Sequence, residues 1–421
     1  MTIEQASALK LSIQGVVVGY VVGYQNGRSL FSLDPAYLAD RDRLTLSIAF
    51  NDPDELLKIA AAMPFSTHHR LHPVLSNLLP EGSLRAIVAQ AIKVHEDSEF
   101  PLLAYLGRDL PGAVVAEPVS SDQLPDSAQR KGTKYETLIL DLPPDTAHFS
   151  LAGVQMKFSM RDSDGRYQTT QHGELGNWIV KTPSTRHPYV PLNEFTVMHL
   201  AGLIGVDIPE IRLIETRKID NLPQINLPDE EFAYGIKRYD RTEDGGRVHS
   251  EDFAQVFFEF AHNKYANQNY EQIGRLIYQK TYRGQQDIVQ MALRLLANIL
   301  LGNGDAHIKN WSLLYPDGRN AILSPAYDIV FTRTYIENES RFALNMNDNK
   351  DWYQVDYQHF TRWAERVGVN PKLIIANLNV ALQKARDLWP QALSDSPMPD
   401  KQKSDLRAHW ARLQPDLKIA T

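Results

Sequence analysis

The chain has 421 residues, of which 43% are hydrophobic and 23% are charged, so it can bury sizeable cores and is neither disordered nor fibrous. Its 44 basic and 51 acidic residues give a formal charge of −7, which argues against a globally basic surface for nucleic acid. Cysteine is absent, so disulfide scaffolds, thiolate zinc sites and cysteine nucleophiles are excluded. With no signal-peptide pattern and no apolar stretch of about 18 residues, we expect a soluble, cytoplasmic, non-membrane protein of two or three domains.

The first 120 residues are expected to form a small β-rich domain. Short apolar segments alternate there with turn signals, of which the Asn26-Gly27 pair favours a type I′ hairpin turn. The predicted strands cover residues 11–13, 16–24, 30–33, 44–50 and 113–116, and the predicted helices cover residues 84–91 and 102–106. Polar residues with prolines and serines fill positions 117–134, which predicts a domain boundary near residue 120.

Residues 121–240 are expected to form a compact unit of strands and one helix. The predicted strands cover residues 156–160, 167–170, 177–181, 211–214 and 234–239. Asn193 is predicted to cap a helix whose apolar residues repeat at helical spacing and which ends at Gly205.

From residue 241 onwards the chain is predicted to be mostly helical. The clearest helix carries an apolar stripe over residues 288–299 and ends at Gly302. A β-hairpin is predicted directly afterwards, at residues 311–323, and the chain beyond residue 357 is helical again.

Three polar residues around that hairpin carry the strongest chemical signal. Asp305 and Asn310 lie five positions apart, between the buried helix and the hairpin, and Asp328 follows the hairpin. Phosphoryl transfer needs one carboxylate to orient and deprotonate a hydroxyl, and an Asn and an Asp to supply oxygen ligands to Mg²⁺. Protein kinases use this order and this spacing. A loop Asp or Asn often only caps a turn, but the ordered trio favours a phosphoryl-transfer site.

A nucleotide would need further contacts upstream of this trio. Lys181 ends an apolar strand and could reach the α- and β-phosphates of ATP, although a strand-end lysine more commonly extends into water. Lys157, also on a predicted strand, competes for the same role. The segment 150–155 has one glycine only, so it is weak evidence for a phosphate loop, yet its backbone N–H groups could bind phosphate.

Other kinds of site have less support. His68, His69 and His72 have no acidic or cysteine partner at ligand spacing, so we expect surface histidines rather than a metal site. Neither Gly-x-Ser-x-Gly nor His-Glu-x-x-His occurs, which argues against common hydrolase and zincin chemistry. The basic residues Arg238 and Arg241, like those of the C-terminal tail, are expected to lie on solvated faces.

Together these motifs resemble the HipA-type serine/threonine kinases, which are toxins of bacterial toxin–antitoxin pairs. The resemblance rests on the segments 77–80, 106–114, 150–157, 179–181, 193–194, 237–241, 251–255, 304–310 and 327–329. It implies an α+β, two-lobed protein-kinase-like fold with an additional small β-rich N-terminal domain. The N-terminal domain would span 1–120, the β-rich N-lobe 121–240 and the helical C-lobe 241–421.

The resemblance also implies roles for single residues in a reaction that uses ATP and Mg²⁺. Asp305 would be the catalytic base, and Asn310 and Asp328 would bind Mg²⁺. The implied ATP-binding residues are Ala152, Gly153, Val154, Gln155, Met156, Lys157, Lys181, Lys237, Arg238, Tyr239, His307, Lys309 and Tyr327. Among them, the backbone of residues 237–239 would be the inter-lobe hinge that meets adenine. Met156 and Lys237 stand where the family often has acidic residues.

In the family, the serine at the position of Ser150 is autophosphorylated, which expels the phosphate-binding loop and inactivates the enzyme. A dianion beside the ATP phosphates is repulsive, which makes this inactivation physically sensible. The implied partner is a small helix-turn-helix antitoxin of the HipB type, which would carry most of the contact with operator DNA. The implied substrate class includes an aminoacyl-tRNA synthetase, glutamyl-tRNA synthetase. A small-molecule kinase of the antibiotic-phosphotransferase type and a non-catalytic nucleotide-binding corepressor remain alternatives.

Overall fold

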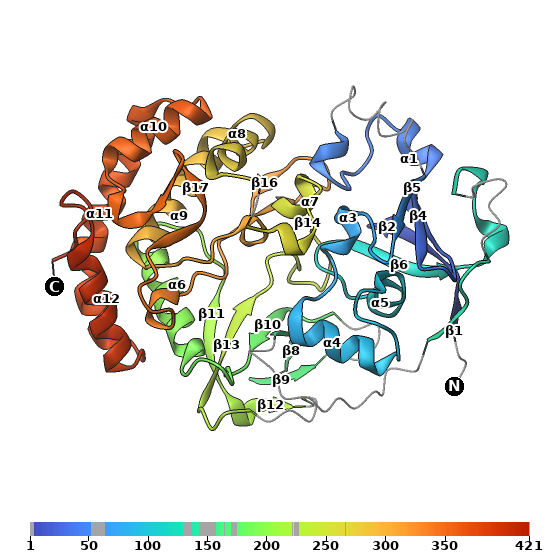
Figure 1. The fold of residues 1–421 in the computed structure, drawn as a ribbon, viewed down its shortest axis with the longest axis horizontal. Coiled ribbons are helices and arrows are strands. Elements are labelled where there is room, and N and C mark those ends of the chain that lie inside the picture. The colour runs from blue at the N-terminus through green and yellow to red at the C-terminus, as the bar shows by residue number, and fades with distance from the viewer. Residues whose placement is uncertain are drawn as a thin grey trace.

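Two larger sheets occupy the first half of the chain, and helices dominate the second half (Figure 1). The computed structural model describes residues 4–51, 64–128, 136–142, 157–163, 165–169, 175–220, 222, 227–265 and 267–420. The N-terminal sheet and helix α12 (Asp400–Arg412) lie at opposite ends of the molecule, and the second sheet lies between them (Figure 1).

The N-terminal sheet has five antiparallel strands in the order β5-β4-β3-β2-β6. These strands are β2 (Ala8–Ile13), β3 (Val16–Gly23), β4 (Arg28–Leu33), β5 (Phe65–His68) and β6 (Val114–Val119). The helices are α1 (Pro35–Ala39), α3 (Pro73–Ser76), α4 (Gly82–Ala91) and α5 (Glu99–Leu106). A short strand β1 (Glu4–Ala6) pairs with β7 (Leu140–Leu142). The predicted type I′ turn at Asn26-Gly27 is wrong, because that turn needs a positive φ at both residues and only Gly27, at +77°, has one. The N–H of Gly27 donates to the carbonyl of Tyr24 at 3.0 Å, so the turn is centred on Gln25 and Asn26.

The strand predicted at residues 44–50 is wrong. Leu46 and Phe50 are buried as an apolar strand would be, but this segment ends in a short 3₁₀ turn at Ile48–Phe50. The N–H of Thr45 donates to the carbonyl of Gly318, 2.8 Å away in the second half of the chain. The N–H of Leu46 donates to the Tyr37 hydroxyl and that of Ile48 to Glu251, so scattered partners rather than a neighbouring strand satisfy this backbone, and the local pattern could not reveal this.

The second sheet has six strands in the order β11-β13-β10-β8-β9-β12, antiparallel except for the parallel β9–β12 pair. Its strands are β8 (Lys157–Ser163), β9 (Arg166–Thr169), β10 (Trp178–Lys181), β11 (Ile211–Glu215), β12 (Ile219–Asp220) and β13 (Phe232–Lys237). Helix α6 (Val190–Leu203) lies beside β11 and β13. From the N-terminal domain, Ile87 of α4 joins the apolar cluster of this sheet around Trp178, so the two sheets are linked through α4.

Asn193 does not cap α6, contrary to the prediction. The helix begins three residues earlier at Val190, with Pro191 in its first turn, where a missing N–H is no loss. Asn193 is buried inside the helix, and its side chain exchanges hydrogen bonds with the backbone of Phe331, at 2.9 Å to the N–H and 3.3 Å to the carbonyl. Its polar side chain thus serves a tertiary contact instead of a cap.

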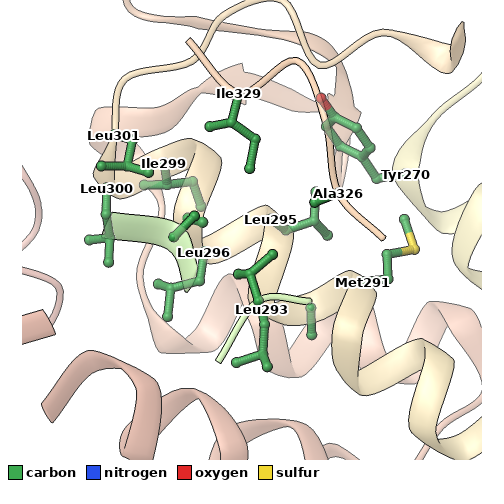
Figure 2. Packing of buried hydrophobic residues seen from close by; sticks show 14 of the residues in the cluster. Tyr270, Met291, Leu293, Leu295, Leu296, Ile299, Leu300, Leu301, Ala326 and Ile329 are labelled. Atoms are coloured by element: carbon green, nitrogen blue, oxygen red, sulfur yellow. The ribbon is translucent and has the colours of Figure 1, made fainter. Parts of the chain in front are cut away.

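The second half of the chain is built around helix α9 (Gly284–Leu300). The predicted apolar stripe of this helix is buried, and its residues pack with Ala326 and Ile329 from the segment after the hairpin (Figure 2). The surrounding helices are α7 (Phe253–Val256), α8 (Tyr270–Lys280), α10 (Tyr357–Val367) and α11 (Pro371–Asp395). The strands are β14 (His249–Asp252), β15 (Ser312–Tyr315), β16 (Ile322–Leu323), β17 (Arg341–Met346) and β18 (Asn349–Asp351).

The predicted hairpin is confirmed as β15 and β16, which pair antiparallel and are extended by β14 on the other side of β15. All six tryptophans of the chain are buried, four of them beyond residue 350. In the part of the chain that the structure describes, no helix has the length and apolar character that crossing a membrane requires.

Candidate active site

The loop after α9 carries Asp305 and Asn310 and is held by local hydrogen bonds. Gly302 opens the loop with a φ of +58°, which glycine adopts without strain. Asn303 donates its side-chain N–H to Asn298 Oδ1 at 2.9 Å, and its own Oδ1 accepts the N–H of Asp305 at 3.2 Å. The amide nitrogen of Asn310 donates to the carbonyl of Asp305 at 2.7 Å, which directs the Asn310 amide oxygen away from that carbonyl.

The carboxylate of Asp305 is exposed, so a substrate hydroxyl can reach it. The phenol of Tyr265 donates to Asp305 Oδ1 at 2.6 Å. Burial, together with the hydrogen bond to Asp305 and its charge, raises the pKa of Tyr265 well above its usual value, so the phenol remains a donor. One oxygen of Asp305 is thereby oriented by the protein, and the second can accept a proton.

A second carboxylate lies behind this loop. The N–H of Gly304 donates to Thr332 Oγ1 at 2.8 Å, and that hydroxyl donates to Glu339 Oε2 at 2.6 Å. Burial raises the pKa of Glu339 to about 7; the Thr332 hydrogen bond opposes this rise and the charge of Asp305 adds to it. The segment after Asp328 is thus coupled to the backbone beside Asp305.

Asp328 follows β16 on a segment that is anchored on α9. Its neighbours Ala326 and Ile329 are buried against Leu295 and other residues of that helix (Figure 2). Asp328 has a φ of +57°, a left-handed conformation that costs energy for a residue other than glycine and that is frequent at functional sites. The core behind Asp328 therefore holds its carboxylate in a set direction.

Lys157 and Lys181 both bind the carboxylate of Asp328. Lys157 Nζ lies 2.9 Å from Oδ2 and 3.2 Å from Oδ1, and Lys181 Nζ contacts Oδ1. Lys157 is half exposed, whereas the side chain of Lys181 is only 5% exposed, so Lys181 does not extend into water. Burial alone would raise the pKa of Asp328, but the two lysines outweigh it and hold that pKa far below its usual range.

Glu194 on α6 is the second partner of Lys181. The two side chains form a buried ion pair, with Glu194 fully buried. Burial works against the charge on Lys181, but Asp328 and Glu194 together raise the pKa of Lys181 above its usual value. Burial also raises the pKa of Glu194, and Lys181 offsets part of that rise. A lysine on a strand, paired with a glutamate on the adjacent helix and directed at the metal-binding aspartate, is the arrangement of phosphate-binding residues in protein kinases.

Asn310 and Asp328 line one small cavity, with Arg294, Asn298 and Tyr327 among the other residues around it. An amide oxygen and a carboxylate are hard ligands suited to Mg²⁺, which usually keeps several waters and takes only one or two protein ligands. The donor set therefore fits Mg²⁺ held together with substrate phosphates. The described residues include no cluster of three or more His, Asp or Glu side chains placed to hold a metal by themselves.

His307 and Tyr327 lie close to this cavity. Burial lowers the pKa of His307 to about 4, so its imidazole is neutral at pH 7, and its buried Nδ1 has no hydrogen-bond partner in the described part of the chain. The phenol of Tyr327 donates to the carbonyl of Lys309 at 2.9 Å, and the ring of Tyr327 lies 5.7 Å from that of Tyr239. The predicted ATP contacts of these residues stay predictions.

The predicted hinge, residues 237–239, begins at Lys237, the last residue of β13. The N–H of Lys237 donates to the carbonyl of Glu210 at 2.8 Å, and that of Arg238 donates to the carbonyl of Asn177 at 2.9 Å. These two amides are engaged within the protein, so an adenine contact here would fall to their carbonyl groups or to the backbone of Tyr239. The side chain of Lys237 points to Glu243 at 2.6 Å.

Part of the predicted phosphate loop lies outside the described residues. This part includes the predicted autophosphorylation site Ser150 and the residues Ala152, Gly153, Val154, Gln155 and Met156. Lys157, where the description resumes, is the first residue of β8 and faces Asp328. Lys157 and Lys181, the two lysines considered for the phosphate role, are paired across β8 and β10, and which of them contacts phosphate stays a prediction.

The expectation that Arg238 and Arg241 are solvated is wrong. Arg238 donates to both carboxylate oxygens of Asp240, at 2.9 and 2.7 Å, and Arg241 donates to Asp240 at 3.0 Å and to Asp109 of the N-terminal domain at 3.0 Å. Both arginines are more than 90% buried. Burial of these charges is tolerated because the two aspartates compensate them.

The histidine prediction is confirmed in part. His68 and His69 are exposed, but His72 is buried among Phe31, Phe50 and Phe65, and its Nδ1 accepts the N–H of Val74 at the start of α3. Burial lowers the pKa of His72 to about 4. This residue acts as a core side chain and a helix cap rather than as a surface group.

Three residues of the site received no role from the sequence: Glu194, which was named only within the motif 193–194, and Tyr265 and Glu339, which were missed. Only Glu194 had a usable signal, since it lies on the helix predicted after the Lys181 strand, where a kinase-like site needs a carboxylate. Tyr265 and Glu339 are 40 and 34 positions from Asp305 in the sequence, and no motif links them to it.

The chain is similar to known proteins over most of its length. The family model of the HipA-like C-terminal domain matches residues 149–389, and that of the HipA N-terminal domain matches residues 9–117. Y4dM of Sinorhizobium fredii, which is named as a candidate kinase, is 38% identical over 408 residues, or 96% of this chain and 97% of Y4dM. The serine/threonine-protein kinase toxin HipA of Shewanella oneidensis is 23% identical over 374 residues, with 82% of each chain covered.

The fold has a close counterpart among solved structures. A structure of Shewanella oneidensis HipA with HipB and its operator DNA matches with a TM-score of 0.71 at 18% identity, and covers 96% of this chain and 95% of that one. At this identity the likeness establishes the fold. Since the C-terminal family model alone spans more than half of the sequence, the chain belongs to the HipA family of kinases and has its two-lobed protein-kinase-like fold with an added N-terminal domain.

Proposed function

We propose that this chain transfers the γ-phosphate of ATP to a serine or threonine hydroxyl of a protein, and that it is the toxin of a toxin–antitoxin pair. The observation that carries the proposal is that Lys181 and Lys157 both bind Asp328, with Lys181 also paired to Glu194, and that Asp328 shares a cavity with Asn310 beside Asp305. Family membership and the names of the relatives support the same activity.

Each residue of the site has a distinct role in this proposal. Asp305, oriented by Tyr265, would accept the proton of the substrate hydroxyl. Asn310 and Asp328 would hold Mg²⁺, which supplies positive charge that stabilises the charge developing on the transferred phosphoryl group. Lys181 and Lys157 would bind phosphate oxygens, with Lys181 held in place by Glu194. Because Asp328 is paired with both lysines, binding of ATP and Mg²⁺ would replace these ion pairs with contacts from the lysines to phosphate and from Asp328 to Mg²⁺.

The activity is tested with γ-³²P-labelled ATP, Mg²⁺ and a lysate of cells that lack the chain. Wild type should label protein, and Asp305→Asn should reduce the rate by a factor on the order of 10² to 10⁴, as expected for the loss of a general base. Asp387→Asn, which alters an exposed aspartate on α11, is the matched control and should label as wild type does. Equal labelling by Asp305→Asn would remove Asp305 from the mechanism.

The same assay separates the proposal from a small-molecule kinase. If label enters the low-mass fraction and not protein, an antibiotic-phosphotransferase type of activity is favoured. The proposed target is a translation component such as glutamyl-tRNA synthetase, which would place the chain in the cytoplasm. Purified synthetase should acquire label from wild type, and much more slowly from Asp305→Asn.

The proposal includes self-inactivation at Ser150. Intact mass after incubation with ATP and Mg²⁺ should rise by one phosphate in wild type and stay unchanged in Ser150→Ala. A phosphate retained in Ser150→Ala would place the modification elsewhere. Loss of phosphotransfer in the phosphorylated fraction would confirm that this modification inactivates the enzyme.

The proposed partner is a HipB-like helix-turn-helix antitoxin that contacts operator DNA. The support is the fold shared with a HipA that was solved together with HipB and operator DNA. Co-purification of the chain with the product of an adjacent short reading frame, and a further shift of operator DNA by the complex, would test it. A catalytically dead Asp328→Asn that retained full toxicity and repression would favour the non-catalytic corepressor instead.

A further inference from the structure

We infer that the N-terminal domain positions the catalytic loop, and that Asn77 and Glu81 of that domain do so through Lys309. The inference rests on the proposed function only in taking residues 302–310 as the catalytic loop. It gives Lys309 a different role from the predicted phosphate contact, because its ammonium group lies at the boundary with the N-terminal domain.

The ammonium group of Lys309 has four oxygen contacts. Nζ lies 2.9 Å from Asn77 Oδ1 and 3.3 Å from the Asn77 carbonyl, 2.8 Å from Asp252 Oδ2 and 3.4 Å from Glu81 Oε1. The side chain of Lys309 is only 11% exposed. Burial opposes its charge, but Asp252 and Glu81 outweigh burial and raise the pKa of Lys309. The ammonium group of Lys309 is therefore engaged by protein oxygens and is poorly placed to bind a phosphate.

Asn77 is a rigid anchor rather than a chance neighbour. It is buried, and its side-chain nitrogen donates to the carbonyl of Pro73 at 2.9 Å and to that of Glu259 at 2.7 Å. These donations fix the amide so that its oxygen faces Lys309. Glu81 is more exposed and also pairs with Lys264 at 3.3 Å, so it should contribute less than Asn77.

Further contacts between the N-terminal domain and the C-lobe surround Lys309. Gln255 of α7 donates to the carbonyl of Val74 in α3 at 2.7 Å, and Asp252, which caps α7, is the partner of Lys309 from the C-lobe. In Figure 1, α3 of the N-terminal domain lies beside α7 and β14. We call the contact of Asn77 and Glu81 with Lys309 the latch. It joins one corner of the N-terminal domain to one corner of the C-lobe.

Lys309 transmits this contact to the reacting groups through the backbone. It is adjacent to Asn310 in the 3₁₀ turn Ile308–Asn310, and Asn310 is bonded to the carbonyl of Asp305. The carbonyl of Lys309 also accepts the phenol of Tyr327, next to Asp328. A shift of Lys309 would move both proposed metal ligands, and displacements of about 1 Å at a reacting centre can lower rates up to about a hundredfold.

The test compares Asn77→Ala with Thr45→Val in the full-length chain. Thr45 lies on the same domain boundary, but its hydroxyl donates to the carbonyl of Arg319 at 2.9 Å, on the hairpin rather than on the catalytic loop. Hydrogen–deuterium exchange over residues 303–311 is the primary measurement, because it needs no substrate and no activity. Asn77→Ala should speed exchange there at least about fivefold, a shift within the range of single-residue coupling, and Thr45→Val should not.

Kinetics give the second measurement. Asn77→Ala should lower kcat about tenfold and change KM for ATP less than about twofold, whereas Glu81→Gln should lower kcat about twofold. Adding Lys309→Met to Asn77→Ala should lower kcat little further, since both substitutions remove the same contact. If Lys309→Met instead raised KM for ATP alone, and if this effect added fully to that of Asn77→Ala, Lys309 would be a phosphate contact. That result would overturn the inference.

The exchange result decides the inference even if the proposed function fails. If wild type transfers no phosphate but Asn77→Ala loosens residues 303–311, the latch stands and the activity is wrong. If exchange over these residues is unchanged, or rises equally in Thr45→Val, the latch is wrong whatever the activity.

Discussion

Replacing Lys181 with methionine should destabilise the protein in a manner that depends strongly on pH. The substitution keeps the length of the side chain but removes the cation between Glu194 and Asp328. Asp328 retains Lys157, whereas Glu194 is left fully buried without a counter-charge. Removal of one member of a buried ion pair typically costs about 3 to 5 kcal/mol.

Protonation of Glu194 limits this cost. A carboxyl with an ordinary pKa of 4.5 takes up a proton at pH 7 at a cost of about 3 kcal/mol, so the variant should lose about that much stability. The folded variant then binds one proton more than its unfolded state, so its stability falls as pH rises. Relative to wild type, the loss should grow by about 1.4 kcal/mol per pH unit above 4.5 and reach about 2 kcal/mol at pH 6.

Urea unfolding at pH 6, 7 and 8, monitored by tryptophan fluorescence, measures this difference. The double variant Lys181→Met/Glu194→Leu is the matched control, because it removes both charges and should abolish the extra pH slope. It should also recover most of the lost stability, as apolar replacements of buried ion pairs often do. A loss for Lys181→Met that is the same at all three pH values would refute the assignment of the cost to an uncompensated Glu194.

The remaining predictions concern three other buried or oriented groups. Burial raises the pKa of Glu251 to about 7, so in wild type the stability that this group contributes is present below pH 4.5 and is lost as pH rises towards 7. Glu251→Gln should remove this pH dependence of the unfolding free energy, which is worth about 2 to 3 kcal/mol over that window in urea titrations. Tyr265→Phe removes the donor to Asp305 and should lower kcat about fivefold, with KM for ATP unchanged in steady-state assays. Asn193→Ala leaves the N–H of Phe331 unpaired in the core and should cost about 2 kcal/mol, seen as a lower Tm.

Each of these has a matched control. Tyr282→Phe alters a tyrosine that is 78% exposed and should leave kcat as in wild type, so an equal loss in both tyrosine variants would contradict the role of Tyr265. Asn377→Ala removes a local contact on α11 and should change stability by no more than about 0.5 kcal/mol. A Tm for Asn193→Ala as high as that of Asn377→Ala would show that the Phe331 contact is dispensable. For Glu251, a pH profile in Glu251→Gln that parallels wild type would place the titration on another group.

Features governed by local periodicity were predictable from the sequence. The stripe on α9 and the hairpin after it depend on spacing within one segment, and both are confirmed. Asp305, Asn310 and Asp328 could be identified because they flank these two elements at the spacing that phosphoryl transfer needs. The helix and the hairpin place these three residues, so a sequence that predicts both elements also predicts where the three residues lie.

Features that depend on distant partners were not predictable. Residues 44–50 have the composition of a strand, but the N–H of Thr45 is bonded to Gly318 and that of Ile48 to Glu251, each more than 200 positions away. Arg238 and Arg241 look like surface charges until Asp109 of another domain is brought against them. In the same way, a lone Lys309 gives no sign that Asn77 holds it, because the contact exists only once the two domains have docked.

Transfer of γ-phosphate from ATP to protein by wild type and by Asp305→Asn, both with native circular dichroism, tests the central claim most directly. We expect Mg²⁺-dependent labelling of protein by wild type and a rate for Asp305→Asn that is lower by a factor on the order of at least 10². Labelling of protein at the same rate by both chains, or no labelling of any protein by wild type that binds ATP and Mg²⁺, would contradict it.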